Sequence, residues 1–133
     1  MVNLISIAIG AIIGTILRYG LNLYTLASGY PYGTIIENIT GSLLLGGLTG
    51  YFAMRSSKEW VKLGLGVGLC GGFTTFSTLA ADSVFVYSDL TLGHAALYVG
   101  VTIFGGILTA MIGYILGQDF ASKRMSTKGR TRS

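Results

Sequence analysis

Charge is the property that this sequence has least of. Only 11% of its 133 residues are charged and 51% are hydrophobic, whereas an ordinary soluble domain has about 25% charged residues. Because a membrane-spanning helix needs about 20 apolar residues, four such helices with short loops account for most of the chain. The composition therefore excludes an ordinary soluble fold and predicts one integral membrane domain.

Proline, cysteine and histidine are also scarce, with one residue of each. Pro31 lies between two tyrosines and predicts a short loop with aromatic side chains at the membrane interface. Cys70 alone excludes an intrachain disulfide, and His94 has no second histidine with which to bind a metal or relay protons. The sequence has no nucleophile elbow, phosphate loop or metal-ligand spacing, so we expect no enzymatic activity.

The basic residues stand mainly in two groups. Three lie in the loop from Arg55 to Lys62, and five of the nine lie in the last eleven positions. This placement is typical of side chains held at anionic headgroups, so we expect membrane lipid and not nucleic acid as a partner. We divide the chain into a four-helix membrane domain, 1–120, and a basic polar tail, 121–133.

Long apolar stretches predict an all-α fold with four transmembrane helices, at about Leu4–Leu26, Thr34–Met54, Val61–Tyr87 and Leu92–Leu116. Small residues four positions apart let two helix backbones approach closely, and such pairs occur at Gly10 with Gly14 and at Gly46 with Gly50. Arg18 is too costly to face lipid, so we expect it to reach a water-facing end or to bond to carbonyls and a partner helix.

The third apolar stretch contains the segment Gly71 to Thr78, a glycine pair followed by alternating rings and hydroxyls. Two glycines weaken a helix, and exposed backbone at membrane depth is tolerated only where it is buried in protein or borders water. The segment therefore predicts a broken third helix, made of two helical pieces joined by a non-helical turn.

Polar residues recur at helical spacing in the second and fourth stretches. Thr34, Asn38 and Ser42 are four residues apart and share one helix face, which predicts a wet path. Asn38 is equally suited to an interhelical hydrogen bond. Tyr98 and Thr102 make a second polar stripe.

Several of these motifs resemble one family. Gly14-Thr15 followed by Arg18-Tyr19, then Gly33-Thr34 with Asn38 and Gly41, and then the segment Gly71 to Thr78 together are similar to the Fluc (CrcB) fluoride channels. The resemblance covers all four predicted helices in order and leaves out only the tail. The third motif is long enough to be specific.

The resemblance implies a multi-pass protein of the cell inner (plasma) membrane that lets fluoride leave the cytoplasm passively. It implies an antiparallel, dual-topology homodimer that encloses two fluoride pores and a central structural sodium ion. The backbone carbonyls of Gly71 and Thr74 would hold the sodium, in keeping with the preference of hard cations for oxygen ligands.

The pore residues implied by the resemblance come from three of the helices. They are Thr34, Asn38, Phe76, Ser77, Thr78, Leu79, Tyr98 and Thr102. A pore for a small, strongly hydrated anion must replace its water with hydrogen-bond donors, and amide and hydroxyl groups do so without a trapping charge. An aromatic ring adds its positive edge.

Two features depart from the family pattern. The second phenylalanine of the motif is replaced by Leu79, which offers no ring edge. With four helices, the N-terminus, the loop from Arg55 to Lys62 and the tail share one side, so the positive-inside rule predicts a single orientation. An antiparallel dimer needs both orientations, and we give the motif more weight than the charge count.

Two other functions stay open at this stage. A small proton-coupled exporter of organic cations would need Glu37 or Asp82 as its exchanging acid. A membrane scaffold that transports nothing would need only the glycine pairs for its assembly.

Overall fold

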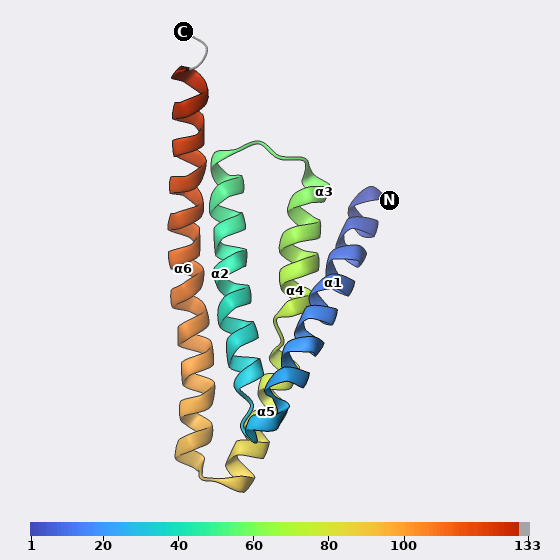
Figure 1. Cartoon of the computed structure of the whole chain (residues 1–133), viewed down its shortest axis with the longest axis vertical. Coiled ribbons are helices and arrows are strands. Elements are labelled where there is room, and N and C mark those ends of the chain that lie inside the picture. Colours follow the sequence, from blue (N-terminus) through green and yellow to red (C-terminus); the bar gives the residue numbers. More distant parts are fainter. Residues whose placement is uncertain (131–133) are drawn as a thin grey trace.

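The chain folds into long helices that run alternately up and down (Figure 1). The computed structural model describes residues 1–130, with side chains up to residue 124, and it is helical throughout apart from short connections. The N-terminus, the connection between α2 and α3, and the end of α6 lie at one end of the molecule. The connections from α1 to α2 and from α5 to α6 lie at the other end.

Three of the helical segments are continuous. They are α1 (Val2–Thr25, followed by the short 3-10 turn η1, Leu26–Ser28), α2 (Tyr32–Met54) and α6 (Leu92–Arg130). Helix α6 extends well beyond Leu116, where the predicted fourth helix ends. The side chains of residues 125–133 lie outside the described part of the structure, so the basic polar tail at 121–133 stays a prediction.

The fourth segment is composite. It consists of α3 (Glu59–Lys62), the π-helical stretch η2 (Leu63–Cys70), α4 (Gly71–Phe73) and α5 (Phe76–Asp89). Thr74 and Thr75, between α4 and α5, have extended backbone, with ψ values of 154° and 130°. π-Helical turns are rare and often occur at functional sites, which draws attention to this segment.

Glycine sets the packing of two helix pairs. A Cβ built on Gly10 or Gly14 of α1 would collide with the backbone of Gly64 or Leu69 in η2. Gly46 and Gly50 of α2 pack in the same way against the backbone of α6, at Ala110 and Tyr114. The close approach predicted from the spacing of both glycine pairs is confirmed.

Three parts of the described chain are long and apolar enough to cross a membrane, namely Val2–Ser28, Glu59–Asp89 and Leu92–Arg124. Helix α2 has 23 residues but is not among them, because Glu37, Asn38 and several glycines and hydroxyl residues reduce its apolarity. Few large side chains are buried, and most of the large apolar ones face outward. A surface of this kind suits lipid or a second copy of the chain.

Candidate functional site

The site is built around the two extended residues between α4 and α5. The Thr74 amide and hydroxyl both donate to the Cys70 carbonyl, at 2.9 Å each, and so close the last turn before the interruption. Thr75 caps the next helix, because its hydroxyl oxygen accepts a hydrogen bond of 3.2 Å from the Thr78 amide. Hydroxyl side chains therefore satisfy backbone groups that a continuous helix would have paired.

Asn38 of α2 holds the interruption from the side. Its Nδ2 donates to the Thr75 carbonyl at 2.9 Å, and its Oδ1 accepts from the Thr75 amide at 2.8 Å. One side chain thus satisfies both backbone groups of one residue. An Asn amide has two N–H donors, so the second Nδ2 hydrogen stays available to another acceptor. The interhelical hydrogen bond predicted as one role of Asn38 is present.

A groove of ≈ 350 Å³ opens beside this contact. Its wall joins residues of α2 and α6 to the interruption, and it includes Asn38, Ser42, Thr75, Phe76, Leu79 and Thr102. Four of the predicted pore residues therefore meet here, namely Asn38, Phe76, Leu79 and Thr102.

The two apolar members of the groove differ in exposure. The Phe76 side chain is 77% exposed and projects from the start of α5. Leu79 is only 4% exposed and packs in a small core with Val86, Ala95 and Tyr98. Leu79 therefore forms part of the groove wall and also fixes α5 against α6.

Thr102 lines the groove, but its hydroxyl donates to the Tyr98 carbonyl one turn earlier, at 2.8 Å. Its proton is therefore occupied within α6. Ser77 is exposed near the start of α5, and its hydroxyl lies 3.2 Å from that of Thr75. Both predicted residues thus lie next to the interruption.

The remaining predicted pore residues converge on Asp82 of α5. Thr34 and Tyr98 both donate to Oδ2 of this carboxylate, at 2.6 and 2.9 Å. Both hydroxyl residues are only 1% exposed. Asp82 thereby ties α2 and α6 to α5.

Thr78 connects Asp82's surroundings to the groove. A second, more polar cavity of ≈ 550 Å³ includes Thr34, Thr78 and Asp82 in its wall. The Thr78 hydroxyl lies 3.0 Å from that of Thr75, which belongs to the first groove. A chain of polar groups therefore runs from Asn38 through Thr75 and Thr78 toward Asp82.

Arg18 and Glu37 are two further ionisable residues beside this chain. The Arg18 guanidinium donates to the Thr78 hydroxyl at 3.4 Å. Glu37 is fully buried, and its Oε2 accepts from Asn22 at 3.1 Å. Its Oε1 and the Arg18 Nε have no hydrogen-bond partner among the described residues. Of the roles predicted for Arg18, bonding to a partner helix is the one observed.

The two residues predicted to hold sodium lie at the same interruption. Gly71 is exposed, with open space where a Cβ would be, and Thr74 has extended backbone. In the described residues no group of three or more His, Cys, Asp or Glu side chains is placed to hold a metal.

The sequence alone assigned Thr75 no individual role, and it indicated Asp82 only as an exchanging acid of the alternative exporter. Asp82 follows Thr78 by four residues, so both share a face of α5, and this spacing was the available signal. Its pairing with Thr34 and Tyr98 joins residues 48 and 16 positions apart in sequence. Such contacts depend on how three helices pack and have no local pattern.

Comparison with known proteins gives consistent similarities. A family model described as CrcB-like protein, Camphor Resistance (CrcB), matches residues 5–114. A protein of Halalkalibacterium halodurans named Fluoride-specific ion channel FluC 2 is 55% identical over 122 residues, which cover 92% of this chain and 90% of that protein.

Two further relatives carry the same name. The protein from Bacillus licheniformis is 37% identical over 134 residues, with 100% of both chains covered. The protein from Bacillus subtilis is 40% identical over 116 residues, which cover 87% of this chain and 88% of that one.

Proposed function

The chain belongs to the CrcB-like protein family, and from this membership we propose that it is a passive, fluoride-selective channel that lets fluoride leave the cytoplasm. The family resemblance predicted from the sequence is confirmed. The family is one of ion channels of the cell membrane, not of enzymes. The proposal rests most on the two-point contact of Asn38 with Thr75, which places an amide donor in the wall of the groove.

The donors on this path suit an anion that holds its water strongly. The free Nδ2 hydrogen of Asn38 and the hydroxyls near Thr75 can replace lost water, while Phe76 offers its ring edge. Apart from Arg18 and the Asp82 carboxylate, which accepts from Thr34 and Tyr98, the path as proposed is lined by neutral groups. Arg18 donates to the Thr78 hydroxyl, which holds its guanidinium within the protein.

A pair of antiparallel copies completes the proposed channel. The groove is open and Phe76 is largely exposed in the single chain, so a second copy would close the path and shield the ring. We take α1, α2, the composite segment Glu59–Asp89 and α6 as four crossings, with the third interrupted at Thr74. Two-fold symmetry then gives two equivalent pores.

The carbonyls of Gly71 and Thr74 suit a structural sodium ion on the axis of such a pair. Two backbone oxygens from one chain are too few to surround a hard cation, so both copies would have to contribute. Bound there, the ion would neutralise carbonyl dipoles at the interruption and hold the two copies together.

Fluoride efflux from liposomes tests whether transport is passive. Purified protein is reconstituted in vesicles loaded with potassium fluoride, and an electrode follows release after a potassium ionophore is added. A passive channel requires the compensating potassium flow and releases fluoride at the same rate with or without an imposed pH gradient. Release that needs the pH gradient would contradict the proposal.

One observation favours a second candidate, a proton-coupled exporter of organic cations. The Glu37 carboxylate is fully buried with one oxygen unpartnered, and buried membrane carboxylates are often proton carriers. Glu37→Gln separates the two candidates, since it removes the exchangeable proton but keeps the size of the side chain. We expect fluoride efflux to persist in this variant, whereas loss of all transport would favour the exporter.

A further inference from the structure

An apolar groove, distinct from the two cavities described above, lies on the other side of helix α2 from Asn38. It has a volume of ≈ 560 Å³ between α2 and α6, and it is lined almost entirely by apolar groups such as Leu44, Gly47 and Leu116. Asn38 and Gly47 are nine residues apart on α2, which at about 3.6 residues per turn places them on opposite sides of the helix. The apolar groove therefore does not belong to the fluoride path.

Two arginines stand at one end of this groove. Its wall ends at the rings of Tyr51 and Phe120, whose centroids are 6.2 Å apart. The Arg55 guanidinium lies 5.9 Å from the centre of the Tyr51 ring and donates to its hydroxyl at 3.1 Å. The Arg124 guanidinium lies 5.9 Å from the centre of the Phe120 ring. The two neighbouring rings thus gather two permanent positive charges.

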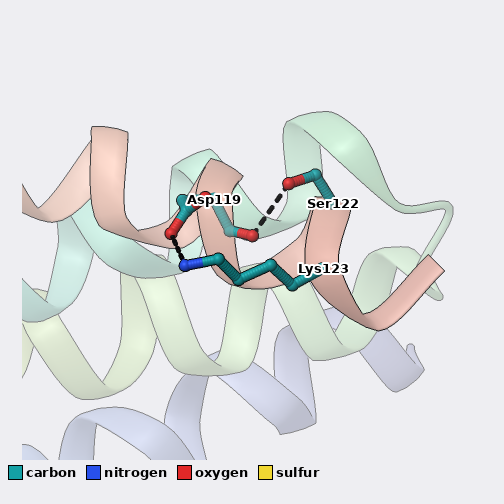
Figure 2. Close-up of polar contacts among 3 residues, drawn as sticks. All are labelled: Asp119, Ser122 and Lys123. Carbon is teal, nitrogen blue, oxygen red and sulfur yellow. Dashed lines mark hydrogen bonds and ion pairs between the residues drawn. The ribbon is translucent and has the colours of Figure 1, made fainter. Parts of the chain in front are cut away.

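The acidic residue nearest to this end in the sequence is already compensated. Asp119 pairs with Lys123 at 2.6 Å, and its carbonyl accepts a hydrogen bond from Ser122 (Figure 2). Positive charge is therefore in excess where the groove ends. Arg55 comes directly after the last residue of α2, a position that puts its charge at the level of lipid headgroups.

We propose that this groove binds one anionic phospholipid. An acyl chain lies along the apolar wall between α2 and α6, and the headgroup phosphate accepts hydrogen bonds from Arg55 and Arg124. Arginine suits this role because its planar fork binds phosphate through two parallel hydrogen bonds, and Arg55 uses only one of its five N–H donors on Tyr51. Basic pockets between membrane helices are typical sites for acidic headgroups.

Native mass spectrometry of the full chain tests the proposal. The protein is incubated with phosphatidylglycerol or with phosphatidylcholine of the same acyl chains, and the retained lipids are counted. We expect selective retention of one phosphatidylglycerol per chain. The double variant R55Q/R124Q should retain it at least about tenfold less, because two charge-assisted contacts are lost. The double variant K58Q/K62Q removes the same charge outside the groove and should retain the lipid.

The apolar half of the site has its own variant. A Cβ at Gly47 meets only the Gly113 carbonyl, at 3.7 Å, so Gly47→Leu fills the groove without a clash at the backbone. It should lower lipid retention, whereas Gly20→Leu, on an open part of α1, should not. Melting temperatures establish that all variants are folded.

Three results would overturn the proposal. Equal retention of the two lipids would show that the groove does not select an anionic headgroup. Full displacement of the lipid by millimolar inorganic phosphate would show that the acyl chain does not contribute to binding. A change in the oligomeric mass of Gly47→Leu would show that a second copy fills the groove.

Discussion

At the scale of single residues, Asn38 takes the place that a neighbouring strand would take beside Thr75. Its amide accepts from the backbone N–H and donates to the backbone C=O of that residue. An unpaired backbone group away from water costs about 1–3 kcal/mol. The side chain therefore stabilises the interruption and, through its second N–H, offers a donor to the groove.

Asn38→Asp tests both roles together. A carboxylate keeps the acceptor for the Thr75 amide but places negative charge against the Thr75 carbonyl and repels an anion. We expect fluoride efflux to fall at least about tenfold, which corresponds to about 1.4 kcal/mol. Asn3→Asp, on an exposed position of α1, is the matched control and should transport normally. Unchanged efflux in Asn38→Asp would exclude Asn38 from the fluoride path.

Leu79 has a structural role, because it is buried in the small core between α5 and α6. Leu79→Ala leaves a cavity there, and such changes cost about 2–5 kcal/mol in protein cores. We expect a clear drop in melting temperature, with little change for Leu97→Ala, whose side chain is 65% exposed. Equal melting temperatures for the two variants would show that Leu79 does not hold α5 in place.

At the scale of helices, glycines determine how close two backbones come. Gly14 of α1 faces the Leu69 carbonyl and the Phe73 amide so closely that no side chain fits. Gly20, six residues later on the same helix, has open space around it. The same residue type thus serves packing at one position and has no such role at the other.

Gly14→Leu should therefore separate α1 from the composite segment. Overpacking of this kind costs about 1–3 kcal/mol, and we expect a lower melting temperature and a loss of monodispersity in gel filtration. Gly20→Leu should behave as the parent chain does. If both variants were equally stable, the contact between α1 and the composite segment would not determine stability.

Local sequence patterns predicted the close helix contacts at the glycine pairs but not the hydrogen bonds that converge on Asp82. The spacing of Gly10 with Gly14 is enough to predict a close contact, because periodicity fixes which face they share. The convergence of Thr34 and Tyr98 on Asp82 depends on the tertiary arrangement of three helices. The three residues are 48 and 16 positions apart, too far for any local sequence pattern to connect them, so only the folded chain brings them together.

At the scale of the whole molecule, charge and symmetry make opposing demands. The basic loop after α2 lies at the same end as the N-terminus and the end of α6 (Figure 1), which favours one orientation in the membrane. The proposed antiparallel pair needs both orientations. Cys70 is the only cysteine, so a Cys70→Ala background allows a single new cysteine to report the orientation.

A cysteine introduced at Ser56 in this background tests the antiparallel pair. A membrane-impermeant thiol reagent applied from outside should label about half of the chains, since each two-fold pair presents one copy each way. A cysteine at Ser88, at the opposite end of the molecule, should give the same fraction. Full labelling of one position and none of the other would establish a single orientation.

Selectivity for fluoride over chloride is the defining property of the proposed channel, and paired efflux measurements test it. Liposomes containing the purified protein are loaded with equal concentrations of fluoride and chloride, and two electrodes follow both anions after the potassium ionophore is added. The proposed pore predicts rapid release of fluoride while chloride stays inside. Retention of both anions, or release of chloride as fast as fluoride, would show that the protein is not a fluoride-selective channel.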